Sequence, residues 1–175
     1  MLQVNKNKGK QTVKNAIISE EDVKQYVLER FNEVKKTKKI KNLVNFQAMN
    51  KYMLMTHDQE ALKKLGNIVA SNKKMSFEEI LENYEKYLIK AFEKEPTAKM
   101  HINVIMHIFG YFSKEFSQHE KELYLDLVER YRNEKITLGN ILAEINTIIF
   151  RFNNTYLVSQ TYFLLYSDTQ PGIIF

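Results

Sequence analysis

Apolar residues recur at helical spacing along most of the chain. In the first such stretch, Val23, Val27, Phe31 and Val34 follow one another three to four positions apart, just after a run of acids that begins at Glu20. Acids at the start of an apolar stripe suit the positive end of a helix dipole. The same spacing predicts further helices over about 41–56, 59–71, 76–95, 98–115, 117–133 and 137–150, and a helix or an extended segment over 156–166.

Helix-start signals divide these stretches. Ser76 with Glu79, and Ser117 with Glu120, have the spacing of a capping box, and Asp58 stands where a side chain can cap the third helix. Only 5 glycines and 2 prolines are present, so few turns are signalled. We expect an all-α fold, a single-domain bundle of about seven or eight helices. The expected boundaries are a flexible basic arm at 1–18, the helical domain at 19–166 and an irregular tail at 167–175.

The composition removes several classes of function. The chain has 175 residues, which suits one domain, and no cysteine, which excludes disulfides, thiolate zinc sites, Cys-ligated iron–sulfur clusters and a cysteine nucleophile. Phosphate-binding glycine loops, the nucleophile elbow and the zinc-protease motif are also missing from the sequence. We therefore predict no catalytic residue, metal or cofactor. Without a secretory signal or an apolar run of about 18 residues, the expectation is a soluble cytoplasmic protein with no membrane segment.

Charge is distributed unevenly along the chain. Residues 1–75 hold 16 Lys/Arg and 7 Asp/Glu, a net +9, whereas residues 76–175 hold 10 and 14, a net −4. A basic half favours a polyanionic partner, although an ordinary solvated lysine surface gives the same balance. The densest basic stretch follows the first predicted helix and contains Lys35, Lys36, Lys38, Lys39 and Lys41.

The predicted helix over 98–115 carries the densest group of chemically useful residues. One stripe opposite its apolar face falls at i, i+4, i+7 and i+11 and consists of Asn103, His107, Gly110 and Lys114. Tyr111 borders this stripe, and His101 points with the apolar residues instead. The two histidines diverge by about 120° on a straight helix, so they cannot bind one metal together.

Three interpretations of this helix stay open. In the first, His107 takes part in acid–base chemistry with an acid supplied by another helix. In the second, Asn103 and His107 satisfy polar partners inside the bundle, and Gly110 lets another helix approach closely. In the third, the stripe is a recognition surface where Lys114 meets a phosphate and Tyr111 or His107 stacks or forms hydrogen bonds. His57, near the end of the second predicted helix, is interpreted as a helix cap.

Several of these stretches resemble the YbgA-like domain family, a domain of unknown function. The strongest match runs from His101 to Phe112, and the resemblance covers about residues 25–165. Shorter matches lie at 51–57, 65–70 and 160–163, and at Tyr84, Tyr87, Tyr131, Arg132 and Leu138. Two stretches depart from the family. Residues 139–146 are acidic rather than basic, and Tyr166-Ser167 replaces a closing Tyr-Pro or Trp-Pro, which weakens a nucleic-acid role for the C-terminal half.

The resemblance implies a helical domain that occurs alone or as the C-terminal partner of a thiouracil-desulfurase-like domain. That partner removes sulfur from thiolated uracil or thiouridine with a Cys-bound iron–sulfur cluster, which this chain cannot supply. In the fused forms the YbgA-like part looks like a tRNA-binding module, and standalone members often lie near photolyase genes. The resemblance carries over to Lys51, His57, His101, Asn103, His107, Tyr111 and Lys114.

The leading hypothesis is a non-catalytic module that binds tRNA or another structured RNA, linked to thiolated-uridine metabolism or a damage response. Its phosphate contacts would come from Lys35, Lys36, Lys38, Lys39, Lys41, Lys51 and Lys114. One alternative is an enzyme, or an enzyme's accessory, in which His57, His101, Asn103 and His107 surround a pocket between helices. Another is an adaptor that docks a desulfurase-like or photolyase-associated protein. The oligomeric state is not predicted.

Overall fold

The computed structural model describes residues 18–168, and within that range the chain forms ten α-helices, one 3-10 turn and no strand. Eight of the helices have seven or more residues, and the all-α expectation is confirmed. The predicted arm and tail lie almost wholly outside the described residues. The elements are α1 (Glu20–Thr37), α2 (Ile40–Met49), α3 (Lys51–His57), α4 (Gln59–Ala70), η1 (Ser71–Lys73), α5 (Phe77–Ala91), α6 (Ala98–Phe112), α7 (Gln118–Arg132), α8 (Leu138–Phe150), α9 (Thr155–Val158) and α10 (Thr161–Tyr166).

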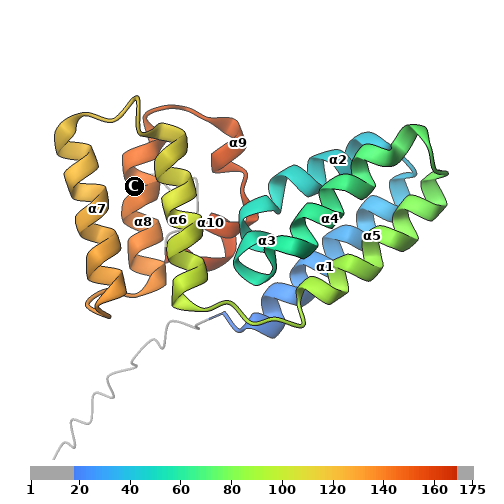
Figure 1. The fold of residues 1–175 in the computed structure, drawn as a ribbon, viewed down its shortest axis with the longest axis horizontal. Helices are drawn as coiled ribbons and strands as arrows, with labels where there is room; N and C mark the ends of the chain where they lie inside the picture. Colours follow the sequence, from blue (N-terminus) through green and yellow to red (C-terminus); the bar gives the residue numbers. More distant parts are fainter. Residues whose placement is uncertain (1–17, 169–175) are drawn as a thin grey trace, which may run out of the picture.

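The helices form two bundles that meet at α3 (Figure 1). The N-terminal bundle consists of α1, α2, α4 and α5, and the C-terminal bundle of α6, α7 and α8 with the short α9 and α10. Helix α3 packs against α4 of the first bundle and against α6 and α10 of the second. One continuous cluster of buried apolar side chains runs through both bundles, so the two are packed as a unit. Within the described range, no helix combines the length and apolar character needed to cross a membrane.

The capping signals in the sequence begin the helices where expected. Ser76–Glu79 and Ser117–Glu120 both form complete capping boxes, and the side chain of Asp58 accepts hydrogen bonds from the backbone of α4. Ser19 and Asp22 form a third capping box at the start of α1. Each pairing satisfies backbone N–H groups that have no partner within the helix, which stabilises the helix start by about 1 kcal/mol.

The helix predicted over 41–56 is wrong as a single element, because it breaks at Asn50 into α2 and α3. Asn50 has φ −100° and ψ 4°, outside the helical range, and its side-chain Nδ2 donates to the carbonyl of Phe46 at 2.9 Å. Asparagine side chains compete in this way with the helical hydrogen-bond ladder. The break frees α3 to turn toward the second bundle.

The segment predicted over 156–166 is also two elements, the short helices α9 and α10. Gln160 stands between them, fully buried. Its Nε2 donates to the carbonyl of Ala48 at 2.8 Å and its Oε1 accepts from the backbone N–H of Tyr52 at 3.4 Å. This side chain therefore satisfies the backbone groups that the break at Asn50 leaves open, and ties α10 to the α2–α3 corner.

Candidate functional site

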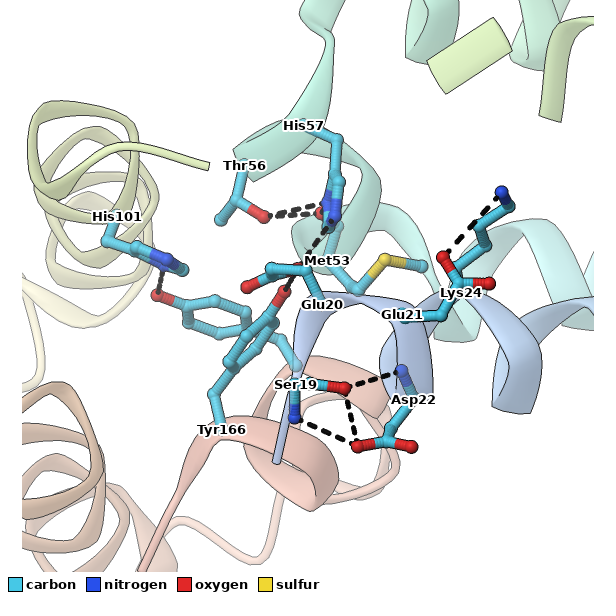
Figure 2. Close-up of polar contacts among 11 residues, drawn as sticks. Ser19, Glu20, Glu21, Asp22, Lys24, Met53, Thr56, His57, His101 and Tyr166 are labelled. Atoms are coloured by element: carbon cyan, nitrogen blue, oxygen red, sulfur yellow. Dashed lines mark hydrogen bonds and ion pairs between the residues drawn. The ribbon is translucent and has the colours of Figure 1, made fainter. Parts of the chain in front are cut away.

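A buried polar cluster lies where the two bundles meet. His57 closes α3 and is almost fully buried, and Glu20 opens α1. The Nε2 of His57 lies 3.2 Å from Oε2 of Glu20, and the hydroxyl of Tyr166, the last residue of α10, donates to the same oxygen at 2.8 Å. Figure 2 shows these three side chains converging from three helices. The cluster therefore joins both ends of the described chain to the α3 corner.

The hydrogen-bond partners of His57 come from its own helix and from α1. Nε2 faces the carboxylate of Glu20, which can only accept, so Nε2 donates to it. Nδ1 lies 3.0 Å from the carbonyl of Met53 and 3.3 Å from the hydroxyl of Thr56. Burial alone raises the pKa of Glu20, but the hydrogen bonds from His57 and Tyr166 outweigh it and lower that pKa below its ordinary value.

His101 belongs to the same junction but is neutral. Its Nδ1 shares a hydrogen bond of 3.0 Å with the hydroxyl of Tyr162, and its ring meets the edge of Tyr166 with centroids 5.2 Å apart. Burial lowers the pKa of His101 to about 4, and the weaker opposing effect of nearby Glu20 does not restore it. The junction thus holds two histidines and a single carboxylate, and His101 is uncharged at neutral pH.

This geometry supports a structural role for the junction. Every fully buried side-chain nitrogen and oxygen in the described part of the chain has a hydrogen-bond partner. The described residues contain no group of three His, Asp or Glu placed to hold a metal. Neither His57 nor His101 lines the groove between α2, α4 and α9 or the pocket between α1, α2 and α10. The cap interpretation of His57 is extended, since the ring also forms a hydrogen bond with Glu20 of α1.

The opposite face of α6 carries the predicted stripe, and it faces solvent. His107, Gly110, Tyr111 and Lys114 are exposed, and Asn103 is half-buried. A Cβ built on Gly110 meets no atom within 4 Å, so the close approach of another helix expected there is wrong. The four predicted pocket residues are therefore divided, with His57 and His101 inside and Asn103 and His107 outside.

Tyr111 connects the stripe to the α9 region. Its hydroxyl accepts from Nδ2 of Asn154 at 3.3 Å, just before α9. The next aromatic residue, Tyr156, meets Tyr52 edge-on with centroids 6.5 Å apart, and Lys51 Nζ lies 5.8 Å from the centroid of Tyr52. Burial, followed by the charges of Tyr156 and Tyr111, raises the pKa of Tyr52 to about 12.

A shallow groove of about 420 Å³ opens beside this aromatic group. Its lining comes from α2, α3, α4 and α9 and consists of Val44, Gln47, Ala48, Lys51, Leu62, Gly66, Val69 and Tyr156. The groove brings Lys51 beside Tyr156, and the hydrogen bond of Asn154 brings Tyr111 next to the same short helix. We use the name α6–α9 face for Lys51 and Tyr156 of this groove, Tyr111 beside α9, and the exposed His107 and Lys114 that continue the α6 stripe.

The remaining predicted cations lie elsewhere. Lys36, Lys38, Lys39 and Lys41 are exposed around the turn between α1 and α2, at the far end of the N-terminal bundle (Figure 1). Lys35 differs from them, because its Nζ forms an ion pair with Glu85 at 2.7 Å and lies 5.3 Å from the ring of Phe31. The structure therefore places four of the predicted phosphate-binding lysines at the α1–α2 turn, apart from Lys51 and Lys114. It also pairs the charge of Lys35 with an acid.

Sequence reasoning missed the acid and the tyrosines that complete the junction. The sequence indicates Glu20 only as a first-turn acid, and it gives no sign of the hydrogen bonds that Tyr162 and Tyr166 form. One signal was available. His101 stands on the apolar face of its helix, and a histidine buried there needs a hydrogen-bond partner from another element. Which element supplies that partner depends on the packing.

Comparisons of the sequence with known proteins give a family match and a relative. A model of the family described as "Protein of unknown function (DUF1722)" matches residues 51–167. The chain is 24% identical over 125 residues to the protein named "Uncharacterized protein YbgA" from Escherichia coli (strain K12), covering 71% of this chain and 74% of that protein. No solved structure matches the chain. The matched region contains α3, α6, α9 and α10, and thus the α6–α9 face and the His57, His101 and Tyr166 side of the junction, whereas Glu20 lies before it.

Proposed function

The chain belongs to the DUF1722 family of proteins of unknown function, and on that premise we propose that it is a non-catalytic module that binds structured RNA, tRNA in the first place. The partners that the resemblance suggests, a desulfurase-like or photolyase-associated protein, would place this binding in thiolated-uridine metabolism or a damage response. The RNA would lie on the α6–α9 face.

The observation that carries this proposal is the chemistry of the exposed side of α6. From Lys99 to Lys114 the exposed and half-buried positions on this side hold cations, amide and imidazole groups and one aromatic ring, and α6 contains no acid at all. Within the described residues no side chain pairs with His107 or Lys114. Lysines supply phosphate contacts, and exposed aromatic or imidazole rings stack on unpaired bases.

The enzyme alternative has less support. It requires His57, His101, Asn103 and His107 around one cleft, and α6 divides them between a packed junction and a solvent-facing stripe. Both ring nitrogens of His57 are engaged by protein partners, the Met53 carbonyl and the Glu20 carboxylate, so neither is free for proton transfer to a substrate. The junction therefore favours fold stability over acid–base chemistry.

The test is binding of total cellular tRNA at two salt concentrations, with the variant Lys51→Glu/Lys114→Glu beside the unmodified protein. We expect binding that weakens steeply with salt, and a variant that loses at least tenfold in affinity. Two lost phosphate contacts should also flatten the plot of log affinity against log salt by about 2.

A matched control separates this surface from overall charge. Lys90 and Lys135 are exposed near the ends of α5 and α7, which Figure 1 places at the opposite edge of the molecule from the C-terminal end of α6. The variant Lys90→Glu/Lys135→Glu changes the net charge equally and should bind nearly as well as the unmodified protein. Equal losses in both double variants would reduce the interaction to nonspecific attraction, and no binding at low salt would end the proposal.

A further inference from the structure

A second pocket lies between α1, α2 and the α9–α10 segment, with a volume of about 340 Å³. Its apolar wall is formed by Tyr26, Val34, Phe46, Met49 and Leu164. Two of these side chains remain unusually accessible for their size, Met49 at 43% and Leu164 at 42%. The wall can therefore cover the flat face of a ligand.

Two nearly buried polar residues line the inner end of this pocket. Asn50 and Thr161 are each 4% exposed. The Nδ2 of Asn50 donates to the carbonyl of Phe46, but neither Oδ1 of Asn50 nor the hydroxyl of Thr161 has a hydrogen-bond partner within the described chain. Every polar side-chain atom that is fully buried in the described residues has a hydrogen-bond partner, so these two atoms without one are not fully buried. Both residues line the pocket, and the pocket gives these atoms their access to solvent. They present an acceptor and a hydroxyl to an incoming molecule.

The charges in the pocket cancel. Arg30 and Glu33 form an ion pair of 3.2 Å on one wall, and the guanidinium of Arg30 lies 5.4 Å from the centroid of the Tyr26 ring. The pocket thus has no unpaired charge, which disfavours a phosphate inside it. An uncharged, flat, hydrogen-bonding group suits this lining, and a nucleobase has these properties.

The outer end of the pocket lies beside the exposed lysines. Thr37 and Asn42 line it and flank the turn that carries Lys38, Lys39 and Lys41. From Asn42 to Asn50 along α2 is about 12 Å at 1.5 Å per residue, enough for one nucleoside with its phosphate at the lysine end. The two ends of the pocket therefore match the two ends of a nucleotide.

We propose that this pocket receives one unpaired nucleobase, whose polar edge is read by Asn50 and Thr161 while the lysine turn holds the adjacent phosphate. The base comes from a single-stranded segment of the bound RNA, which is the part of the inference that rests on the proposed function. A free nucleoside offers the same edge and is the other source to be distinguished.

The experiment compares a short RNA hairpin with an unpaired loop, the same hairpin with abasic loop positions, and individual free nucleosides. The variants are Thr161→Val, which removes the hydroxyl while keeping the shape, and Leu164→Trp, which fills the pocket from an exposed position. We expect Thr161→Val to weaken binding of the intact hairpin about fivefold, consistent with one lost hydrogen bond, without changing the salt dependence. Leu164→Trp should weaken it to the level of the abasic hairpin.

Thr161→Ser is the conservative control, because it restores the hydroxyl and should restore binding. Thermal unfolding of each variant shows that the fold is intact. Intact hairpin binding in both Thr161→Val and Leu164→Trp would overturn this inference and leave the RNA proposal standing. Loss of RNA binding in Lys51→Glu/Lys114→Glu but in neither pocket variant would also overturn this inference while supporting the RNA proposal. If free nucleosides bind the unmodified protein and this binding is lost in Leu164→Trp, the pocket is supported even where RNA binding fails.

Discussion

The two faces of α6 carry similar residues in different environments. His101 faces inward, lies 5% exposed, and shares its Nδ1 with a buried tyrosine. His107, six positions later, faces solvent without a partner among the described residues. The inward face closes a network in which each polar group is satisfied by another helix, whereas the outward face leaves its groups available. Polar residues that are fully paired inside a fold stabilise it, and those left unpaired at the surface are the candidates for recognition.

The largest expected effect is a loss of stability in mild acid through His101. Its pKa is about 4 in the folded protein, against 6.5 when exposed, so the unfolded chain binds the proton first as the pH falls. The stability that the neutral His101 ring contributes is complete above about pH 6.5 and is lost progressively toward pH 4. The total loss is about 3 kcal/mol of the free energy of unfolding. Urea unfolding between pH 7.5 and pH 4 measures it.

His101→Phe removes the titrating group and should flatten the pH dependence in this window, whatever its effect on absolute stability. His107→Phe, on the other face of the same helix, should leave the slope as it is in the unmodified protein. A slope that survives in His101→Phe would show that another group is responsible.

The next largest effect concerns the pair of Glu20 and His57 at the junction. Glu20→Gln replaces the carboxylate that accepts from His57 and Tyr166 with a neutral amide, and should reduce the free energy of unfolding by roughly 1–2 kcal/mol, since hydrogen bonds to a charged acceptor become ordinary ones in a partly exposed setting. Glu21→Gln is the neighbouring control, because that side chain is 76% exposed and pairs only weakly with Lys24. Equal stability of the two variants at pH 7 would contradict the role of the pair.

A smaller effect tests the outward face. Tyr111→Ala should lower affinity for tRNA by about 1 kcal/mol, roughly fivefold, through the loss of one stacking ring. Its stability should change by no more than about 0.5 kcal/mol, as is usual for exposed positions. The measurement pairs tRNA binding with thermal unfolding. A variant that is less stable yet binds normally would show that Tyr111 serves packing against α9.

The smallest expected effect is a gain in stability. Gly110→Ala adds a methyl group where nothing lies within 4 Å, in a helix with ordinary backbone angles, and should stabilise the protein by about 0.5–1 kcal/mol. Gly139→Ala is the contrasting variant, because its Cβ would collide with the carboxylate of Asp168, which also accepts a hydrogen bond from Asn140. Destabilisation by Gly110→Ala would mean that another element does approach this position.

The positions of most helices and of the α6 stripe followed from the sequence because they depend on local rules. Capping boxes at Ser76 and Ser117, and apolar residues three and four apart, specify where a helix begins and which side is buried. The same geometry correctly divided His101 from His107. The breaks at Asn50 and Gln160 did not follow, because each depends on a side chain that is satisfied by a distant part of the chain.

What the sequence by itself determined was therefore the all-α class, the helix boundaries with local signals, the inward direction of His101 and the outward direction of His107. Only the tertiary structure decided that Glu20, His57 and Tyr166 share one oxygen, and that the lysines divide between the α1–α2 turn and the α6–α9 face. These contacts span 37 and 146 residues along the chain. Periodicity orients a side chain relative to its own helix, but the partner it meets is set by how the two bundles pack across α3.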